Sequence, residues 1–528
     1  YYVCAALTLA LASCSTQKMP TTLITSYDKL PLKNTPLSEN DLKRWSHLDL
    51  IKDTVPGMSV DKAYAELLKG KKPKQVVVAV VDSGIDINHP DLAANIWNNP
   101  KEVAGNGIDD DKNNYVDDVH GWNFLGDSDR ENMEYVRILK KGDDGSAEYK
   151  RAKAEHESDM AEAMQGKMQV DFITKAIETL QKETKKETLT VADINAINSK
   201  DSEVNAAKET LSRILGRVSF EDLKSQVNSM KDHYYGQLNG HLNLQLDGRK
   251  VVGDNPNDIK DTKYGNNNVV GPIIGSAKHG THVSGIIAQT RGNDLGGDGV
   301  ADGFVKIMAV RAVPDGDEYD KDIALAIRYA ADNGAKVING SFGKYYSPNK
   351  EWVQDALKYA ESKDVLVIFA AGNDSKDLDV INKYPSDSYD GKPATLTNVM
   401  IIGALNPSYG SDMVASFSNY GAENVDIFAP GAKIYATTPE NTYEYLQGTS
   451  MASPNAAGVA AMVRAYYPSL TAAEVKQVLM ESGITLTQDI KVGERKIQKP
   501  FNTVSKSGKI INAYNAIILA DKMAKKKK

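Results

Sequence analysis

The chain has 528 residues, of which 41% are hydrophobic and 25% charged, a composition typical of a soluble globular protein large enough for several domains or for one domain with insertions. Its formal net charge of −7 gives no indication of nucleic-acid binding. Both cysteines, Cys4 and Cys14, lie near the N-terminus, so the rest of the chain contains neither a disulfide framework nor a thiolate metal site.

Residues 1–14 are apolar and uncharged, too short to span a bilayer, and typical of a signal peptide truncated at its start. Leu11-Ala12-Ser13-Cys14 resembles the bacterial lipobox, in which the cysteine is lipidated and becomes the new N-terminus. We therefore expect attachment to a membrane of the bacterial cell envelope through Cys14, on the periplasmic or outer-membrane surface. A plain signal peptide with an incidental cysteine would instead give a secreted protein.

Residues 15–74 are expected to form a tether and an N-terminal extension, because the first part is rich in Ser, Thr, Pro and Lys. Ser59 is expected to cap a short helix that ends at Gly70. At the other end of the chain, residues 521–528 are expected to form a basic tail.

The run from Gln75 to Val81 is continuously β-branched, which predicts a central parallel strand buried on both faces. Asp82 follows at its carboxyl end, where open α/β sheets place functional groups, although a simple turn aspartate is the alternative. Further strands and intervening helices alternate along the chain, which predicts a parallel sheet with right-handed crossovers. These strands are expected over 306–311, 335–339, 365–371, 400–403 and 425–428, and the helices over 322–333 and 352–362.

Residues 127–235 interrupt this pattern and are rich in Lys, Glu, Asp, Ala and Met. Apolar residues recur three and four positions apart, which predicts an inserted helical hairpin or small bundle. Thr190 with Asp193, and Ser219 with Asp222, have the spacing of a capping box.

A serine and a histidine stand where a nucleophile and a base could act. Ser450 precedes a small-residue helix expected over 452–461, and the free N–H groups and dipole of a helix start suit a nucleophile that generates an oxyanion. An N-cap serine on a core helix is the alternative. His279 and His282 lie three apart before a helix expected over 283–288, but no third ligand stands at a spacing suited to zinc.

An acidic loop places side-chain oxygens at alternate positions, as calcium loops do. Its sixth position is Asn114 rather than Gly and its twelfth is His120 rather than Glu, so it is not an EF-hand. A solvated acidic turn is the alternative to a calcium site. The candidate ligands are Asp109, Asp111, Asn113 and Asp117.

Four short motifs occur in a fixed order along the chain. They are Asp82-Ser-Gly-Ile-Asp with His89-Pro-Asp-Leu, His279-Gly-Thr-His-Val-Ser-Gly, Ala370-Ala-Gly-Asn373, and Gly448-Thr-Ser450-Met-Ala-Ser-Pro. Together they resemble the subtilisin-like serine proteases. The resemblance implies a three-layer α/β fold with a mostly parallel central sheet over 75–126 and 236–520, interrupted by the helical insertion.

The resemblance also implies roles for individual residues. Ser450 would be the nucleophile, His279 its general base and Asp82 the carboxylate that orients the base, while Asn373 and the Ser450 backbone N–H would bind the oxyanion. Ser341, Phe342 and Gly343 would pair with an extended substrate and border the specificity pocket together with Ala371 and Gly372. Asp91 and the loop beginning at Asn293 would form a second calcium site.

We therefore expect a serine endopeptidase of the cell envelope that hydrolyses proteins or peptides through an acyl-enzyme. The alternative is a partner-binding envelope protein in which the helical insertion is the functional surface and proteolysis is secondary. The intact set of Asp82, His279, Asn373 and Ser450 favours the peptidase.

Overall fold

The computed structural model describes residues 19–20, 22–23, 35–301, 303–388 and 394–527. The expected signal peptide, Cys14 and most of the expected tether lie outside the described residues. None of the helices that are described is both long and apolar enough for a membrane span.

A nine-stranded sheet forms the centre of the molecule, in the order β10-β13-β7-β6-β5-β4-β1-β3-β2. Its described pairings are parallel except that of β10 with β13. The strands are β1 (Val76–Asp82), β2 (Gly121–Asn123), β3 (Val305–Arg311), β4 (Val337–Gly340), β5 (Leu366–Ala370), β6 (Val399–Leu405), β7 (Ile427–Pro430), β10 (Ile484–Thr485) and β13 (Lys509–Ile510).

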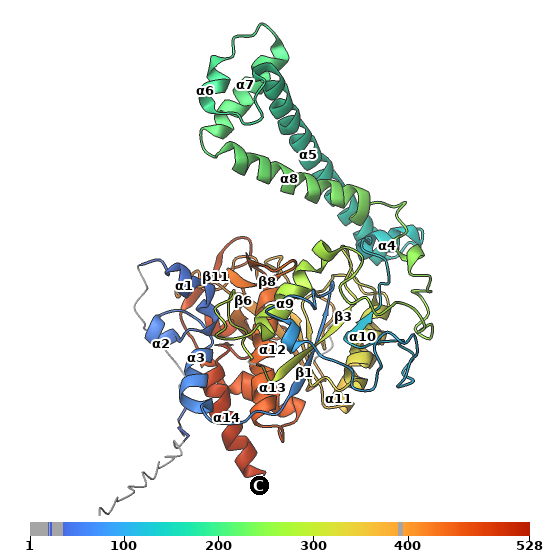
Figure 1. Cartoon of the computed structure of the whole chain (residues 1–528), viewed down its shortest axis with the longest axis vertical. Coiled ribbons are helices and arrows are strands. Elements are labelled where there is room, and N and C mark those ends of the chain that lie inside the picture. Colours follow the sequence, from blue (N-terminus) through green and yellow to red (C-terminus); the bar gives the residue numbers. More distant parts are fainter. Residues whose placement is uncertain (1–18, 21, 24–34, 302, 389–393, 528) are drawn as a thin grey trace, which may run out of the picture.

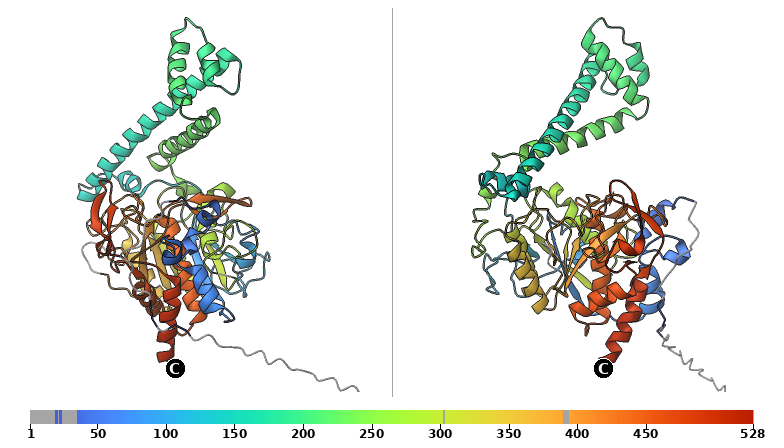
Figure 2. Two further views of the ribbon diagram at one scale, coloured as in Figure 1. Left: turned by 90° about the vertical axis from the view of Figure 1, so that its left-hand side faces the viewer. Right: turned by 180° about the vertical axis from the view of Figure 1, so that it is seen from behind.

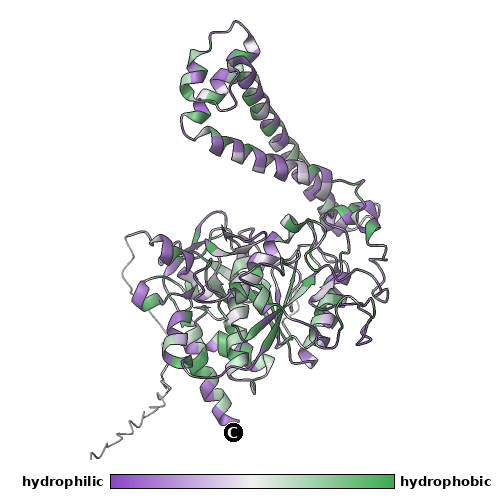
Figure 3. Cartoon of the chain, in the orientation of Figure 1, coloured by the Kyte–Doolittle hydropathy of each residue, from purple (hydrophilic) through white to green (hydrophobic). Residues whose placement is uncertain are grey.

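Helices cover both faces of this sheet (Figures 1 and 2). On one face, α9 (Lys278–Ala288) packs against α12 (Thr449–Tyr466), and α12 crosses β1 and β4 to β7. On the other, α10 (Asp320–Asp332) packs against α11 (Lys350–Ser362). The sheet with helices on both faces is the expected three-layer α/β arrangement. Apolar residues concentrate in the sheet and these helices, as Figure 3 shows.

The five strands expected after β1 are present as β3 to β7, with ends shifted by at most two residues. The two helices that carry His279 and Ser450 begin earlier than expected, at Lys278 and Thr449. As a result His279 and Ser450 each lie inside a first helical turn rather than before it.

The N-terminal extension packs on the sheet domain through α1 (Glu39–Lys43), α2 (Leu50–Asp53), α3 (Val60–Lys62) and short turns. The buried indole of Trp45 donates a hydrogen bond to the Ala432 carbonyl at 3.0 Å. The expectation that Ser59 caps a helix is wrong, since its φ is 56° and its side chain makes no capping bond. Its hydroxyl instead donates to Asp49 and accepts from Asn512.

A helical arm, defined here as residues 147–236, projects from the sheet domain (Figure 1). It contains α5 (Ala147–Thr184), α6 (Val191–Ala196), α7 (Ser202–Leu215) and α8 (Phe220–Gly236). The outer part has its own apolar core, in which Val170, Leu180 and Leu211 are fully buried. Thr190 and Asp193 form the expected capping box at the start of α6.

The base of the arm is tied to the sheet domain by α4 (Glu134–Lys140) and the segment before it. The Glu131 N–H donates to the Asp315 carbonyl, and the Asp315 N–H donates to the Asp129 carbonyl, both at 2.9 Å. The Asp317 N–H donates to the Asn132 carbonyl at 3.3 Å. Residues 129–132 therefore run alongside residues 315–317, which follow β3, and are joined to them by backbone hydrogen bonds.

Elements that the sequence analysis did not anticipate complete the domain. They are the hairpins β8 (Ile434–Thr438) with β9 (Thr442–Leu446) and β11 (Asp489–Val492) with β12 (Ile497–Pro500), and the helices α13 (Ala472–Ser482) and α14 (Ala513–Lys526). Because α14 continues to Lys526, most of the expected basic tail is helical.

Candidate active site

Asp82 ends β1 and is buried at the carboxyl edge of the sheet, with 1% of its surface exposed. Its Oδ1 accepts a hydrogen bond from the Ser83 N–H at 2.8 Å and lies 2.7 Å from Nδ1 of His279. Its Oδ2 is buried and has no hydrogen-bond partner among the described residues. The Ser83 backbone therefore fixes the oxygen that Asp82 presents to the imidazole.

His279 lies in the first turn of α9, whose close approach to β1 depends on the neighbouring glycine. A Cβ at Gly280 would collide with the Gly84 carbonyl oxygen. Burial disfavours the imidazolium, but the charge and hydrogen bond of Asp82 favour it more, so the pKa of His279 is raised above its ordinary value. With Nδ1–H donating to Asp82, Nε2 of the neutral ring is free to accept a proton.

Ser450 is the second residue of α12. Its hydroxyl donates to the Ser341 carbonyl at 3.2 Å, and the Ser341 hydroxyl donates to the Ser450 carbonyl at 2.8 Å. Asn339 in turn donates to the Ser341 hydroxyl at 2.9 Å. The start of α12 is thus tied to the end of β4, and the serine hydroxyl has to turn from Ser341 toward His279 to act as a nucleophile.

Asn373 follows β5, and its side chain is held at the carbonyl end only. Its Oδ1 accepts hydrogen bonds from the Thr449 N–H at 2.8 Å and the Thr449 hydroxyl at 2.9 Å, whereas its Nδ2 has no partner among the described residues. A Cβ at Gly448 would lie 3.3 Å from that Nδ2 and 3.5 Å from the Ser450 backbone nitrogen. Two N–H donors therefore converge on the space beside Gly448, as an oxyanion site requires.

Ser341-Phe342-Gly343 directly follows β4, and Ala371-Gly372 directly follows the neighbouring strand β5. Both segments lie beside the start of α12, since Ser341 bonds to Ser450 and the Gly372 N–H donates to the Thr449 hydroxyl. A cleft of about 560 Å³ opens here. It is lined by Asp82, His279, the segment 341–343 and, on its other side, residues 313–318. Asp82, His279 and the segment 341–343 thus border one groove, and Ser450 is joined to its rim through the hydrogen bonds with Ser341.

Residues 73–501 match the family model described as "Subtilase family". The chain belongs to the subtilase family. This finding confirms the resemblance carried by the four motifs and, with the observed sheet and its two helical layers, confirms the expected fold.

Three curated relatives show how far the subtilase resemblance extends. The thermophilic serine proteinase of Bacillus sp. (strain AK1) is 42% identical over 186 residues, which cover 35% of this chain and 42% of the relative. The cell wall-associated protease of Bacillus subtilis (strain 168) is 34% identical over 276 residues, or 52% of this chain and 27% of the relative. Subtilisin DY of Bacillus licheniformis is 35% identical over 217 residues, or 41% of this chain and 74% of the relative.

The chain thus spans less than half the length of the first two relatives. Among solved structures, that of a protease from Pseudoalteromonas arctica matches with a TM-score of 0.37 at 29% sequence identity. The match covers 46% of this chain and 70% of the Pseudoalteromonas arctica chain.

His282 of the subtilase lies one helical turn after His279 and is fully buried. Its Nε2 lies 3.1 Å from the carbonyl oxygens of both Ile434 and Glu444, which belong to the hairpin β8–β9. Burial lowers its pKa to about 4, so it is neutral and donates its proton to this hairpin. Its surroundings are those of a structural residue.

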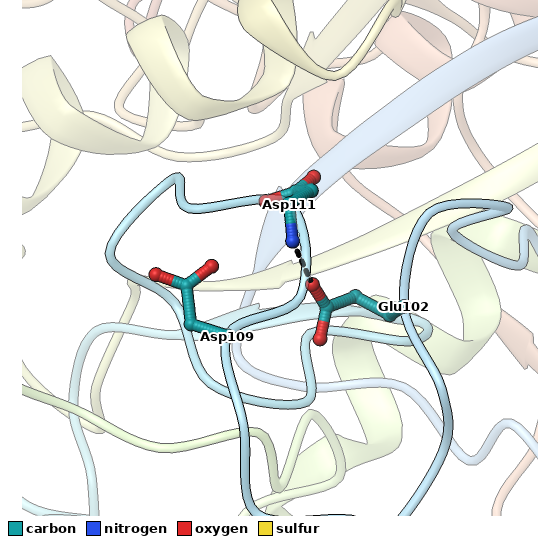
Figure 4. Close-up of side chains that lie close together, drawn as sticks. All are labelled: Glu102, Asp109 and Asp111. Atoms are coloured by element: carbon teal, nitrogen blue, oxygen red, sulfur yellow. Dashed lines mark hydrogen bonds between the residues drawn. The ribbon is translucent and has the colours of Figure 1, made fainter.

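The acidic loop brings together Asp109, Asp111 and Glu102, whose carboxylate oxygens lie within 4.8 Å of one another (Figure 4). The Asp111 N–H donates to Glu102 Oε1 at 3.1 Å, and the buried Oε2 of Glu102 has no partner among the described residues. Three hard oxygen ligands with an unsatisfied carboxylate oxygen fit Ca²⁺. Glu102 was not anticipated because it precedes the alternating pattern.

The other two candidates of this loop face different groups. Asp117 accepts hydrogen bonds from the N–H groups of Gly105, Asn106 and Gly107, which hold the turn. Asn113 donates its N–H to both Asp109 and Asp111, while its side-chain amide donates to Asp118. Asn113 therefore positions the two carboxylates through its backbone, and Asp117 shapes the turn.

At the expected second calcium site, Asp91 and Asn293 contact each other directly. Nδ2 of Asn293 donates to Oδ1 of Asp91 at 2.6 Å, and Tyr443 donates to Oδ2 at 3.4 Å. Asp298 of the same loop pairs with Arg44. These bonds engage both carboxylate oxygens of Asp91, whereas the acidic loop keeps one buried carboxylate oxygen, Oε2 of Glu102, without a partner among the described residues.

Proposed function

We propose that this subtilase is a serine endopeptidase that cleaves proteins or peptides through an acyl-enzyme. The observation that carries the proposal is the convergence of the Asn373 amide and the Ser450 N–H beside the nucleophile, next to the hydrogen-bonded pair of Asp82 and His279. A structural helix start needs neither a second, unpartnered donor nor a buried carboxylate behind the base.

In the first half-reaction, Oγ of Ser450 bonds to the carbonyl carbon of the substrate and its proton passes to Nε2 of His279. Asp82 holds the imidazole and stabilises the imidazolium, and the two N–H donors bind the oxyanion. The carbon–nitrogen bond then breaks as His279 returns the proton to the leaving amine. Water repeats the sequence on the ester, releasing the acid and regenerating the serine.

Substrate is proposed to lie along the cleft as an added β-strand against 341–343. Support comes from the position of this segment directly beyond β4, at the lip of the groove. Calcium is proposed at Glu102, Asp109 and Asp111, where it would offset the mutual repulsion of the carboxylates. Attachment to the cell envelope through a lipidated Cys14 remains part of the proposal and rests on the sequence motif alone.

The proposal is tested by labelling with a serine-reactive fluorophosphonate and by casein hydrolysis, in the wild type and in Ser450→Ala. We expect the wild type to label and to degrade casein, and the alanine variant to do neither while it unfolds at an unchanged temperature. Casein hydrolysis by the folded alanine variant at a rate near that of the wild type would refute the assignment of the nucleophile.

A further inference from the structure

Lys383 is a buried lysine beside the cleft, with 7% of its surface exposed. It lies in the long connection from β5 to β6. The backbone beside it is held in place, because its neighbour Tyr384 and Lys344 exchange two backbone hydrogen bonds, both of 2.9 Å. Its ammonium donates to the Phe342 carbonyl at 3.2 Å and to the Ala370 carbonyl at 2.8 Å.

The lysine side chain stands between the two segments that border the proposed specificity pocket. A Cβ at Gly343 would collide with Nζ, and a Cβ at Gly372 would lie 3.2 Å from Cε. Both glycines are only half-buried, with φ of 156° and 102°. Lys383 thus occupies the space between the ends of β4 and β5, where the side chain of the residue before the cut would enter.

The ammonium has no carboxylate within ion-pair distance among the described residues. Of its three N–H donors, two are used by carbonyl groups. Glu318 and Asp374 act on it electrostatically from farther away. Asp374 is bonded to the Tyr345 hydroxyl, and burial raises the pKa of Glu318 to about 7, so the latter is only partly ionised at neutral pH.

A buried ammonium that lacks a carboxylate partner gains most from a ligand that brings one. At the same time, the lysine takes up the space that a large apolar side chain would need. Resting on the proposed function, we propose that Lys383 is a specificity-determining residue that directs cleavage to the peptide bond after an acidic residue, Glu or Asp.

The test compares peptide p-nitroanilides that differ only in the residue before the cut, Glu, Gln or Phe, with active sites counted by the fluorophosphonate. Glu and Gln have the same shape, so their kcat/KM ratio isolates the charge. A charge-assisted hydrogen bond predicts a ratio of about 10 to 100 in favour of Glu. Lys383→Met, which keeps most of the length without the charge, should bring this ratio close to 1.

Lys383→Gly should open the pocket and raise kcat/KM for Phe above that for Glu. A Glu to Gln ratio that is the same in the wild type and in Lys383→Met would overturn the proposal. So would a Lys383→Gly variant that gains equally on all three substrates, because the lysine would then only obstruct the pocket. A wild type that fails to react with the fluorophosphonate would refute the proposed peptidase instead.

A pH profile of the wild type gives a second test that does not depend on the Lys383 variants. Burial lowers the pKa of Lys383 to about 8, and kcat/KM reports the free enzyme. Above that pH the ammonium loses its charge, so the Glu to Gln ratio should fall toward 1, while the titration of His279 affects both substrates alike and cancels. Because Glu318 also ionises near neutrality, Glu318→Gln must retain the fall, and a ratio independent of pH from about 6 to about 10 would contradict the proposal.

Discussion

At the scale of single residues, Gly448 is what keeps the proposed oxyanion site open. Its φ of 152° and its lack of a side chain leave room between the Asn373 amide and the Ser450 nitrogen. Thr449 holds Asn373 by its carbonyl oxygen, which leaves the amide nitrogen beside that space. The donor is therefore oriented before any substrate arrives, which makes its contribution largest in the transition state.

Asn373→Ala should lower kcat by about 10²- to 10³-fold with little change in KM, because the lost hydrogen bond forms mainly to the oxyanion. Steady-state kinetics on one peptide substrate measure both constants. Ser375→Ala on the same loop, whose hydroxyl faces Ser416, is the matched control and should keep kcat. A loss confined to KM would mean that Asn373 binds the ground state instead.

The proposed catalytic residues could be named from the sequence because each lies near the end of a buried strand or at a helix start, within a short motif. The role of Lys383 could not be predicted in this way. Its partners Phe342 and Ala370 lie on other segments, which only the pairing of β4 with β5 brings together. Glu318 was missed for the same reason, because Lys344 and Lys383, whose charges act on it, lie on other segments. Glu102 was missed because it precedes the alternating pattern of the acidic loop. The sequence around Lys383 gives no local signal that its side chain is buried.

At the scale of elements, buried strands were predictable because continuous β-branched runs have few alternatives. The hairpin β8–β9 was not, because β9 is mostly exposed and carries no run of this kind. The expected cap at Ser59 failed because the residue takes a left-handed conformation and its hydroxyl joins two distant segments. Tertiary hydrogen bonds outweighed the local capping preference there.

The acidic loop should make stability depend on calcium. At free calcium about a hundredfold above Kd, binding adds roughly 2.7 kcal/mol to the free energy of unfolding, a rise of a few degrees in melting temperature for a domain of this size. Asp111→Ala should remove most of that rise, measured by thermal unfolding with calcium and with EGTA.

Asp117→Asn is the matched control for this measurement, since Asp117 holds the turn through the N–H groups of Gly105, Asn106 and Gly107. It should lower the melting temperature in both buffers but keep the calcium-dependent rise. An equal rise in the wild type and in Asp111→Ala would show that the loop is only a solvated turn.

At the scale of the whole molecule, the arm is joined to the sheet domain by buried charges. Glu134 of α4 pairs with Arg137 and with Lys344, which lies just beyond β4. Burial alone would raise the pKa of Glu134, but the two cations lower it to about 2. Among the described residues, none of the outer arm, residues 169–231, pairs with these charges, and this part packs around its own apolar core.

Replacing residues 169–231 by a short Gly/Ser linker should therefore leave a folded enzyme that hydrolyses small peptides at a rate close to that of the full chain. The two cut ends are close, since Gly166 of α5 lies against the ring of Tyr234 in α8. Removing all of 127–235 should instead prevent folding, because Lys344 would lose Glu134 and become a buried, partly unpaired charge, at a cost of about 3–5 kcal/mol.

Soluble yield, melting temperature and peptide hydrolysis distinguish the two deletions. A folded linker variant that no longer hydrolyses small peptides would show that the outer arm takes part in catalysis.

The length of α5 has a hydrodynamic consequence. At 1.5 Å per residue its 38 residues span about 57 Å. One end is anchored at the sheet domain, and the other, free of that domain, packs into the apolar core of the arm. A tilt of only a few degrees at the anchored end displaces the free end by several ångströms, in the manner of a lever. The projecting helix also adds friction without adding much mass, so the protein should sediment more slowly than a sphere of its 57.5 kDa.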